Sequence, residues 1–194
     1  MKILSGIKCI KKLLVPLLLT FLLNASAQGV YKSSEGEVSF FSKAPLENIE
    51  AHNKSLTSLI NTSTREVVFV VPIRNFKFAK TLMQEHFNEK YLESDKYHDA
   101  TFKGKINESI DFTKDGEYKV TASGTMTIHG VEKQVTDSGT LKIKSGTLLL
   151  NSAFMIALKD YNIKIPTLVI KNIADVIPVK LNASYLPYKK EGVQ

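Results

Sequence analysis

Apolar and polar residues alternate strictly over several long stretches of the chain. From 118 to 129, the even-numbered residues are Tyr, Val, Ala, Gly, Met and Ile, while the odd-numbered ones are Lys, Thr, Ser, Thr, Thr and His. Because successive side chains of a strand point to opposite faces, this run predicts a strand of about 12 residues with one apolar face. The alternation resumes after Gly130, so a long hairpin is expected, with His129 at its corner and turned toward water.

Alternation or short apolar runs predict strands in further segments as well. These segments are 37–42, 54–61, 66–73, 99–106, 147–158 and 173–185. Together with the hairpin they give about eight strands. Long strands with two unlike faces leave unpaired edges, and closing the sheet on itself removes those edges. We therefore expect an all-β fold, an eight-stranded antiparallel barrel with one main inserted helix.

That helix is expected over 79–91, where an amphipathic stripe recurs at helical spacing. The stripe consists of Ala79, Leu82, Met83, His86, Phe87 and Lys90. The strand at 66–73 is apolar on both faces, so the helix is predicted to cover its outer side. A second, weaker helix or a loop is expected over 160–172, where Pro166 limits any helix before it.

The interior of such a barrel is either filled by side chains or hollow enough for one small ligand. Several residues of inward parity are small, which favours an elongated apolar cavity. They are Ala122, Gly124, Gly139, Ser152 and Ala183. The alternative is that these positions only accommodate the helix or the sharp corners of the barrel.

The first 27 residues have the make-up of a secretory signal peptide. They combine four lysines and no acid with an apolar run of 11 residues and a closing Ala-Ser-Ala. That run is shorter than the roughly 20 residues that span a bilayer, and Pro16 interrupts it. We therefore expect cleavage before Gln28, one domain over 28–194, no transmembrane span after cleavage, and a periplasmic or secreted protein.

Composition narrows the function classes further. Without 1–27, 22 Lys and Arg remain against 19 Asp and Glu, and aromatic residues do not interleave with a basic cluster, so nucleic acid is not an expected partner. The single cysteine, Cys9, lies in the leader, so stability must come from burial without disulfides. The oligomeric state stays open, with a homodimer as one candidate.

Groups for catalysis or metal binding are few. No two histidines have ligand spacing, and no nucleophile elbow or phosphate-binding glycine loop occurs. His98 lies near Asp95 and Asp99, and these three could hold a metal or move a proton, although a solvated loop before a strand explains them as well. No catalytic residue, metal or cofactor is expected, and the chain is predicted not to be an enzyme.

Three segments in order resemble the YceI-like family of exported lipid-binding proteins. They are HFNEKYLESDKYHDATFKGKI (86–106), GTMTIHGVEKQVT (124–136) and FMIALKDYNIKIP (154–166). Asn162 stands where the family commonly has glycine, which is tolerable because Asn enters the left-handed region readily. Residues 44–62 are less similar to the family.

The resemblance implies a lipocalin-like barrel around a polyisoprenoid or fatty chain, with any polar head near the helix and loops. The expected function is that of a non-catalytic carrier of a long-chain amphiphile. The alternative is a structural or interaction protein of the cell envelope with a packed barrel and no ligand. The candidate ligand-binding residues are Leu82, Met83, Phe87, Phe102, Tyr118, Val120, Met126, Ile128, Phe154, Ile156, Ile177 and Val179.

Overall fold

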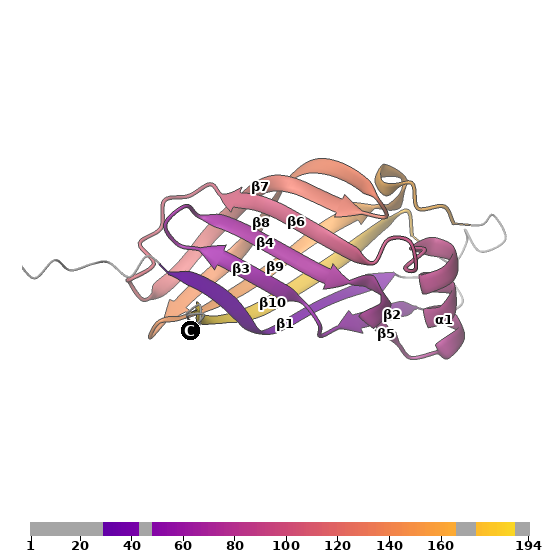
Figure 1. The fold of residues 1–194 in the computed structure, drawn as a ribbon, viewed down its shortest axis with the longest axis horizontal. Coiled ribbons are helices and arrows are strands. Elements are labelled where there is room, and N and C mark those ends of the chain that lie inside the picture. The colour runs from indigo at the N-terminus through magenta and orange to yellow at the C-terminus, as the bar shows by residue number, and fades with distance from the viewer. Residues whose placement is uncertain (1–28, 43–47, 166–173, 189–194) are drawn as a thin grey trace, which may run out of the picture.

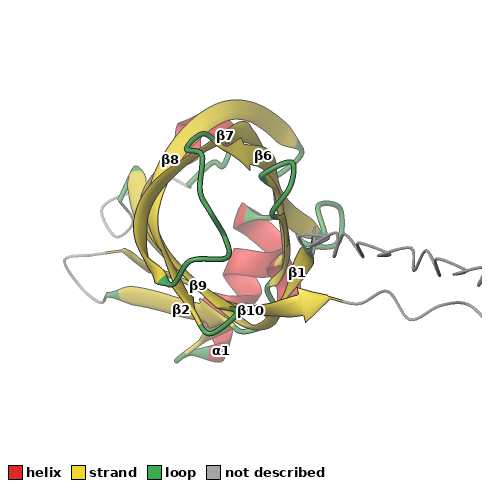
Figure 2. Ribbon diagram, turned by 90° about the vertical axis from the view of Figure 1, so that its left-hand side faces the viewer, coloured by secondary structure: helices red, strands yellow, loops and turns green. Residues whose placement is uncertain are grey.

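A closed antiparallel barrel forms the body of the computed structural model, which describes residues 29–42, 48–165 and 174–188 (Figure 1). Eight strands close the ring in the order β1, β3, β4, β6, β7, β8, β9 and β10, because β10 pairs again with β1. The view along the barrel shows the ring of strands with a helix behind it (Figure 2). This confirms the predicted eight-stranded barrel. The expected signal peptide, 1–27, lies outside the described residues.

The barrel strands differ mainly in length. They are β1 (Val30–Ser42), β3 (Thr57–Asn61), β4 (Glu66–Pro72), β6 (Asp99–Ile106), β7 (Gly116–Ile128), β8 (Val131–Lys144), β9 (Thr147–Ala157) and β10 (Val176–Tyr188). Two further strands, β2 (Ile49–Asn53) and β5 (Lys77–Phe78), extend the sheet beyond the second half of β1. They were not predicted.

The main helix lies across one end of the barrel, which is called the mouth end below (Figure 1). It consists of α1 (Thr81–His86) and the π-helical turn η2 (Phe87–Tyr91), in good agreement with the expected range. Its expected role was wrong, since the helix faces the interior of the barrel instead of covering β4. The outer side chains Val68 and Val70 of β4 are only partly buried, which a wall strand of a single-layer barrel tolerates.

The β7–β8 hairpin turns where the sequence predicted. His129 and Gly130 both have positive φ, 52° and 73°, as a two-residue hairpin turn requires. Thirteen residue pairs run in register from Gly116–Ile143 to Ile128–Val131. By contrast, β8 and β9 pair only from Gly139 to Lys144, so among the described strands the first half of β8 pairs with β7 alone.

Two short 3-10 helices lie in the loops between the strands. η1 (Ile73–Asn75) follows β4, and η3 (Leu158–Tyr161) ends at Asn162, which has a φ of 55°. The positive φ agrees with the expectation for the glycine-like position, and the segment up to 165 is a loop. The rest of 160–172 lies outside the described residues. None of the described helices is long and apolar enough to span a bilayer.

The half of the barrel away from the mouth end is a packed core. Tyr185, Leu141, Leu148 and Ile60 are all 0% exposed. The hydroxyl groups of Ser58 and Tyr185 share a hydrogen bond of 2.8 Å in this core. Burial raises the pKa of the Tyr185 hydroxyl well above its usual value, so the neutral side chain is held in an apolar surrounding.

Candidate functional site: an apolar cavity beneath the helix

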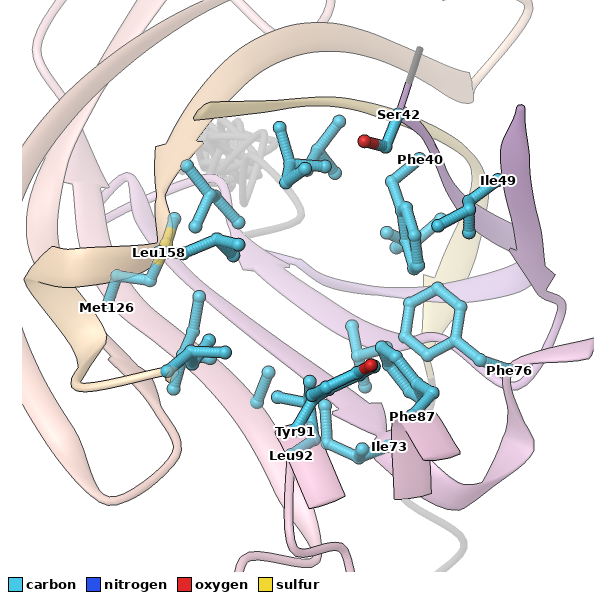
Figure 3. A pocket seen from close by; sticks show the side chains of 18 of the residues that line it. Phe40, Ser42, Ile49, Ile73, Phe76, Phe87, Tyr91, Leu92, Met126 and Leu158 are labelled. Carbon is cyan, nitrogen blue, oxygen red and sulfur yellow. The ribbon is translucent and has the colours of Figure 1, made fainter. Parts of the chain in front are cut away.

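A cavity of about 300 Å³ fills the half of the barrel at the mouth end. Its wall is almost entirely hydrocarbon, as the side chains in Figure 3 show. The wall comes from inward positions of β1, β4, β6, β7, β9 and β10, together with the segment from η1 to β5, the helix α1 and η2, and the loop after η3. Its principal side chains are Val38, Phe40, Phe69, Val71, Ile73, Phe76, Phe78, Met83, Phe87, Phe102, Met126, Ile128, Phe154, Ile156, Ile163, Ile177, Val179 and Leu181.

Four phenylalanines form one aromatic cluster where the helix meets the barrel wall. Phe87 of η2 lies 5.7 Å from Phe40, 5.5 Å from Phe76 and 5.0 Å from Phe78, measured between ring centroids. Such tilted and offset ring pairs add attraction beyond the burial of area. The cluster therefore fixes the helix to β1 and to the segment around β5, and it forms one side of the cavity.

The helix turns the middle of the predicted stripe toward the cavity, but the edges of that stripe differ from the prediction. Met83, His86, Phe87 and Tyr91 line the cavity, whereas Leu82 is 61% exposed. The π-helical turn explains the position of Tyr91. In a π turn the residue one turn after His86 is five positions on, so Tyr91 takes the inward place that a regular α-helix would give to Lys90.

Two hydroxyl groups point into the otherwise apolar space. Figure 3 shows the oxygens of Ser42 and Tyr91 directed into the pocket among carbon side chains. The backbone N–H of Ala174 donates to Ser42 Oγ at 3.1 Å, and a hydroxyl that accepts a bond in this way can still donate its own proton. Burial raises the pKa of Tyr91, so its hydroxyl stays protonated at neutral pH. These groups could hydrogen-bond a polar atom of a bound molecule.

His129 joins three segments at the mouth end. Its Nδ1 lies 3.1 Å from the carbonyl oxygen of Tyr161, and its Nε2 lies 2.7 Å from a carboxylate oxygen of Glu93, both within hydrogen-bond distance. The Tyr97 ring packs edge-on against His129 at 4.6 Å, and the histidine side chain is only 11% exposed. The expectation that His129 faces water was therefore wrong, because parity along a strand does not show what folds over its end.

The contacts of His129 with Tyr161 and Glu93 should contribute to the stability of the fold. His129→Asn keeps a residue that tolerates positive φ, so the turn should persist while the bonds to Tyr161 and Glu93 are lost. We expect the free energy of unfolding to fall by about 2 kcal/mol in urea denaturation. His98→Asn, at an exposed histidine bonded to Ser94 O, should change it by less than about 0.5 kcal/mol. Equal losses in the two variants would show that His129 clamps nothing.

Nine of the twelve predicted ligand-binding residues line the cavity. They are Met83, Phe87, Phe102, Met126, Ile128, Phe154, Ile156, Ile177 and Val179. Three do not: Leu82 points to solvent, Val120 belongs to the packed half, and the Tyr118 hydroxyl donates to the Lys114 carbonyl. Sequence reasoning missed Phe40, Phe76 and Phe78, although the spacing of aromatic residues in 76–78 beside the helix was a usable signal.

The small inward residues do not create the cavity. None of Ala122, Gly124, Gly139, Ser152 and Ala183 is on its wall. A Cβ on Gly124 would collide with the backbone of Lys103 and Gly104, so this glycine permits a close approach of β7 to β6. A Cβ on Gly104 would meet the Phe102 ring at 2.6 Å, so large neighbouring side chains already occupy the space. At Gly124 the small residue is explained by this close approach of two backbones, and not by a cavity.

The residues near His98 in the sequence do not form a common metal or proton-transfer site with it. His98 is exposed and donates to the Ser94 carbonyl at 3.0 Å, while Asp95 pairs with Arg74. Across the described part of the chain, no group of three or more His, Cys, Asp or Glu side chains is placed to hold a metal ion.

Comparisons with known proteins agree with this architecture. A family model described as a YceI-like domain matches residues 19–185. A polyisoprenoid-binding domain from Saccharophagus degradans, implicated in plant cell wall breakdown, has a similar fold with a TM-score of 0.70 at 16% identity, covering 81% of this chain and 98% of that one. BcnA of Burkholderia cenocepacia gives 0.66 at 17% identity, covering 77% and 95%. The YceI protein of Campylobacter jejuni gives 0.60 at 17%, covering 76% and 90%. No curated protein sequence matches the chain.

Proposed function

The chain belongs to the YceI-like family, and from that premise we propose that it is a non-catalytic carrier that encloses the aliphatic part of an amphiphile in the cavity beneath α1. The observation that carries the proposal is a cavity of about 300 Å³ with a hydrocarbon wall and two hydroxyl groups. The name of the Saccharophagus degradans domain, which refers to polyisoprenoid binding, supports a lipid as the ligand.

Burial of a chain in this cavity supplies the binding free energy. Each CH₂ group removed from water contributes about 0.8 kcal/mol. Ten such groups would contribute roughly 8 kcal/mol before the loss of ligand freedom and side-chain ordering is subtracted. The nine predicted residues on the wall are the proposed contacts, and the hydroxyls of Ser42 and Tyr91 are the proposed partners of a polar atom.

Two features favour a carrier over the other functions considered. A solidly packed barrel would leave voids of no more than about one or two water molecules, roughly 30 Å³ each, and the cavity is about 300 Å³. Among the described residues His86 has no acid or hydroxyl partner that would orient it as a base, unlike the paired groups of nucleophilic enzymes. Export to the periplasm or the medium is part of the proposal, and it rests on the composition of 1–27.

The direct test is to identify what the protein carries. Protein purified from its own host under native conditions should release a long-chain compound on organic extraction, and native mass spectrometry should show the matching mass on the intact protein. Cell fractionation of the same host should place the protein outside the cytoplasm. Empty protein that also fails to bind added fatty alcohols would overturn the proposal.

A cavity-filling variant tests the location of the site. Ala100 lies on the wall, and Ala100→Phe would add a ring that needs about half of the cavity. Ligand affinity should fall at least tenfold, while the free energy of unfolding should stay level or rise by about 0.5–2 kcal/mol through the filled space. The matched control is Lys103→Phe on the exposed side of the same strand, which should bind as the parent protein does. Unchanged binding by Ala100→Phe would place the ligand elsewhere.

A further inference from the structure

We propose that the packed half of the barrel limits the buried part of the ligand to a chain of about 12 carbon atoms. The protein would then select amphiphiles with one medium-length aliphatic chain, and not ones whose whole long polyisoprenoid tail must be enclosed. This inference rests on the proposed function and adds a length limit to it. The limit comes from the volume of the cavity and from the side chains that form its floor.

The volume of the cavity determines how many carbon atoms of a ligand it can enclose. An apolar protein cavity of roughly 150 Å³ takes up one benzene ring, which has six carbon atoms. A cavity of about 300 Å³ therefore holds on the order of 12 carbon atoms. That corresponds to about two isoprene units, so a longer tail would have to extend past the helix into water.

Strand register shows where the floor begins. On β10, Ile177, Val179 and Leu181 line the cavity, and Leu181 pairs with Ser152 of β9. The next inward pair is Ala183 with Leu150, and neither residue is on the cavity wall. Leu150 is 9% exposed and is the first large side chain below Leu181 on this side.

The floor continues through two more rows of fully buried side chains. Leu150 pairs with Leu141 of β8, and the next row contains Tyr185 and Leu148, the latter paired with Ile143. Leu141, Leu148 and Tyr185 are each 0% exposed, so no space remains between these rows for a chain.

A hydrogen bond across the interior holds the floor in place. Ser58 belongs to β3 and Tyr185 to β10, and β1 lies between these strands in the ring. Their hydroxyls are 2.8 Å apart, with the two residues 1% and 0% exposed. A ligand that pushed Tyr185 aside would leave two buried hydroxyls without partners, which is costly. The floor therefore resists a longer chain.

A competition among chain lengths tests the limit. The delipidated full chain is mixed with equimolar straight-chain alcohols of about 8 to 24 carbons, and native mass spectrometry measures the occupancy of each. Below the limit, every added CH₂ group should raise affinity about fourfold. Near 12 carbons the rise should stop, because further groups stay in water. A rise that continues through about 20 carbons overturns the length limit alone. A protein that binds none of the alcohols overturns the proposed function as well.

A substitution in the floor, with a matched control, tests whether the Leu150 side chain sets the chain-length limit. Leu150→Ala removes three carbon atoms from the floor. The break, meaning the chain length at which affinity stops rising, should then move to chains about two or three carbons longer. Leu149→Ala is the same change at the adjacent residue, whose side chain points to the outer face, and should leave the break unchanged. A break that stays in place in Leu150→Ala protein that retains its fold contradicts the assignment of Leu150 as the floor. If that variant does not fold, Leu150→Val gives the same comparison with a smaller step, and the wild-type series still tests the limit.

Discussion

Gly124→Val is expected to lower the free energy of unfolding by about 3 kcal/mol or more, a large part of the 5–15 kcal/mol typical of a domain. Gly124 faces Gly104 across the β6–β7 pair, and a Cβ there would collide with the backbone of Lys103 and Gly104. Backbone atoms of a paired strand cannot turn away as a side chain can. The two strands must therefore separate, and the barrel loses local pairing. Urea denaturation followed by circular dichroism measures the effect.

Gly36→Val is the matched control for this prediction. The three atoms nearest to a Cβ on Gly36 would all belong to the side chain of Leu56, the nearest at 2.9 Å. A side chain can shift by a few tenths of an ångström, so the expected loss is about 1 kcal/mol. If both variants lost the same free energy, close approach of the β6 and β7 backbones would not be the reason for glycine at 124.

Period-two alternation was sufficient to predict the barrel, and the reason is physical. A strand with one apolar face must bury that face, and eight such strands satisfy both burial and edge pairing by closing. Of the strands missed, β5 has two residues, too short for any pattern, whereas β2 has five, as many as the predicted β3. They pair beyond the second half of β1, which no local pattern reveals.

The depth of each residue within the barrel could not be predicted from parity. Val120 and Met126 lie on the same face of β7, yet Met126 lines the cavity and Val120 belongs to the packed half. The difference depends on the register of all eight strands and on the bulk of side chains that arrive from opposite strands. Small inward residues did not mark the position of the cavity, because large side chains from neighbouring positions fill the space beside them. At Gly104, for example, that space is taken by the Phe102 ring.

The role of His129 was also hidden from the local pattern. Its partners, Glu93 and Tyr161, lie 36 and 32 residues away in sequence. The turn itself was predictable from His129 and Gly130, but the contacts of the turn depend on where η3 and the segment after η2 are placed. A polar residue at a corner can thus be a structural link between loops.

Tyr185→Ala should be the most damaging substitution in the core away from the cavity, with a loss of about 3–5 kcal/mol in the free energy of unfolding. The side chain is 0% exposed, and its removal leaves a void and an unpaired Ser58 hydroxyl. Tyr185→Phe separates these two causes. It keeps the ring and loses only the hydrogen bond, so the expected loss is about 1–3 kcal/mol. Adding Ser58→Ala to Tyr185→Phe should recover most of that loss, because neither buried partner is then unsatisfied.

The same tyrosine predicts a dependence of stability on alkaline pH. Burial raises the pKa of folded Tyr185 above the value of 10.0 for a free side chain. Below pH 10 the hydroxyl is protonated in both states, and stability does not depend on it. Above pH 10 the unfolded chain releases the proton first, so the unfolded state binds fewer protons and stability falls by up to about 1.4 kcal/mol per pH unit. Tyr185→Phe removes this contribution, so its stability should fall less steeply between pH 10 and 11 than that of the wild type. Parallel slopes for the two proteins in urea titrations would contradict the buried, neutral state of Tyr185, and with it the sealed floor that limits the cavity.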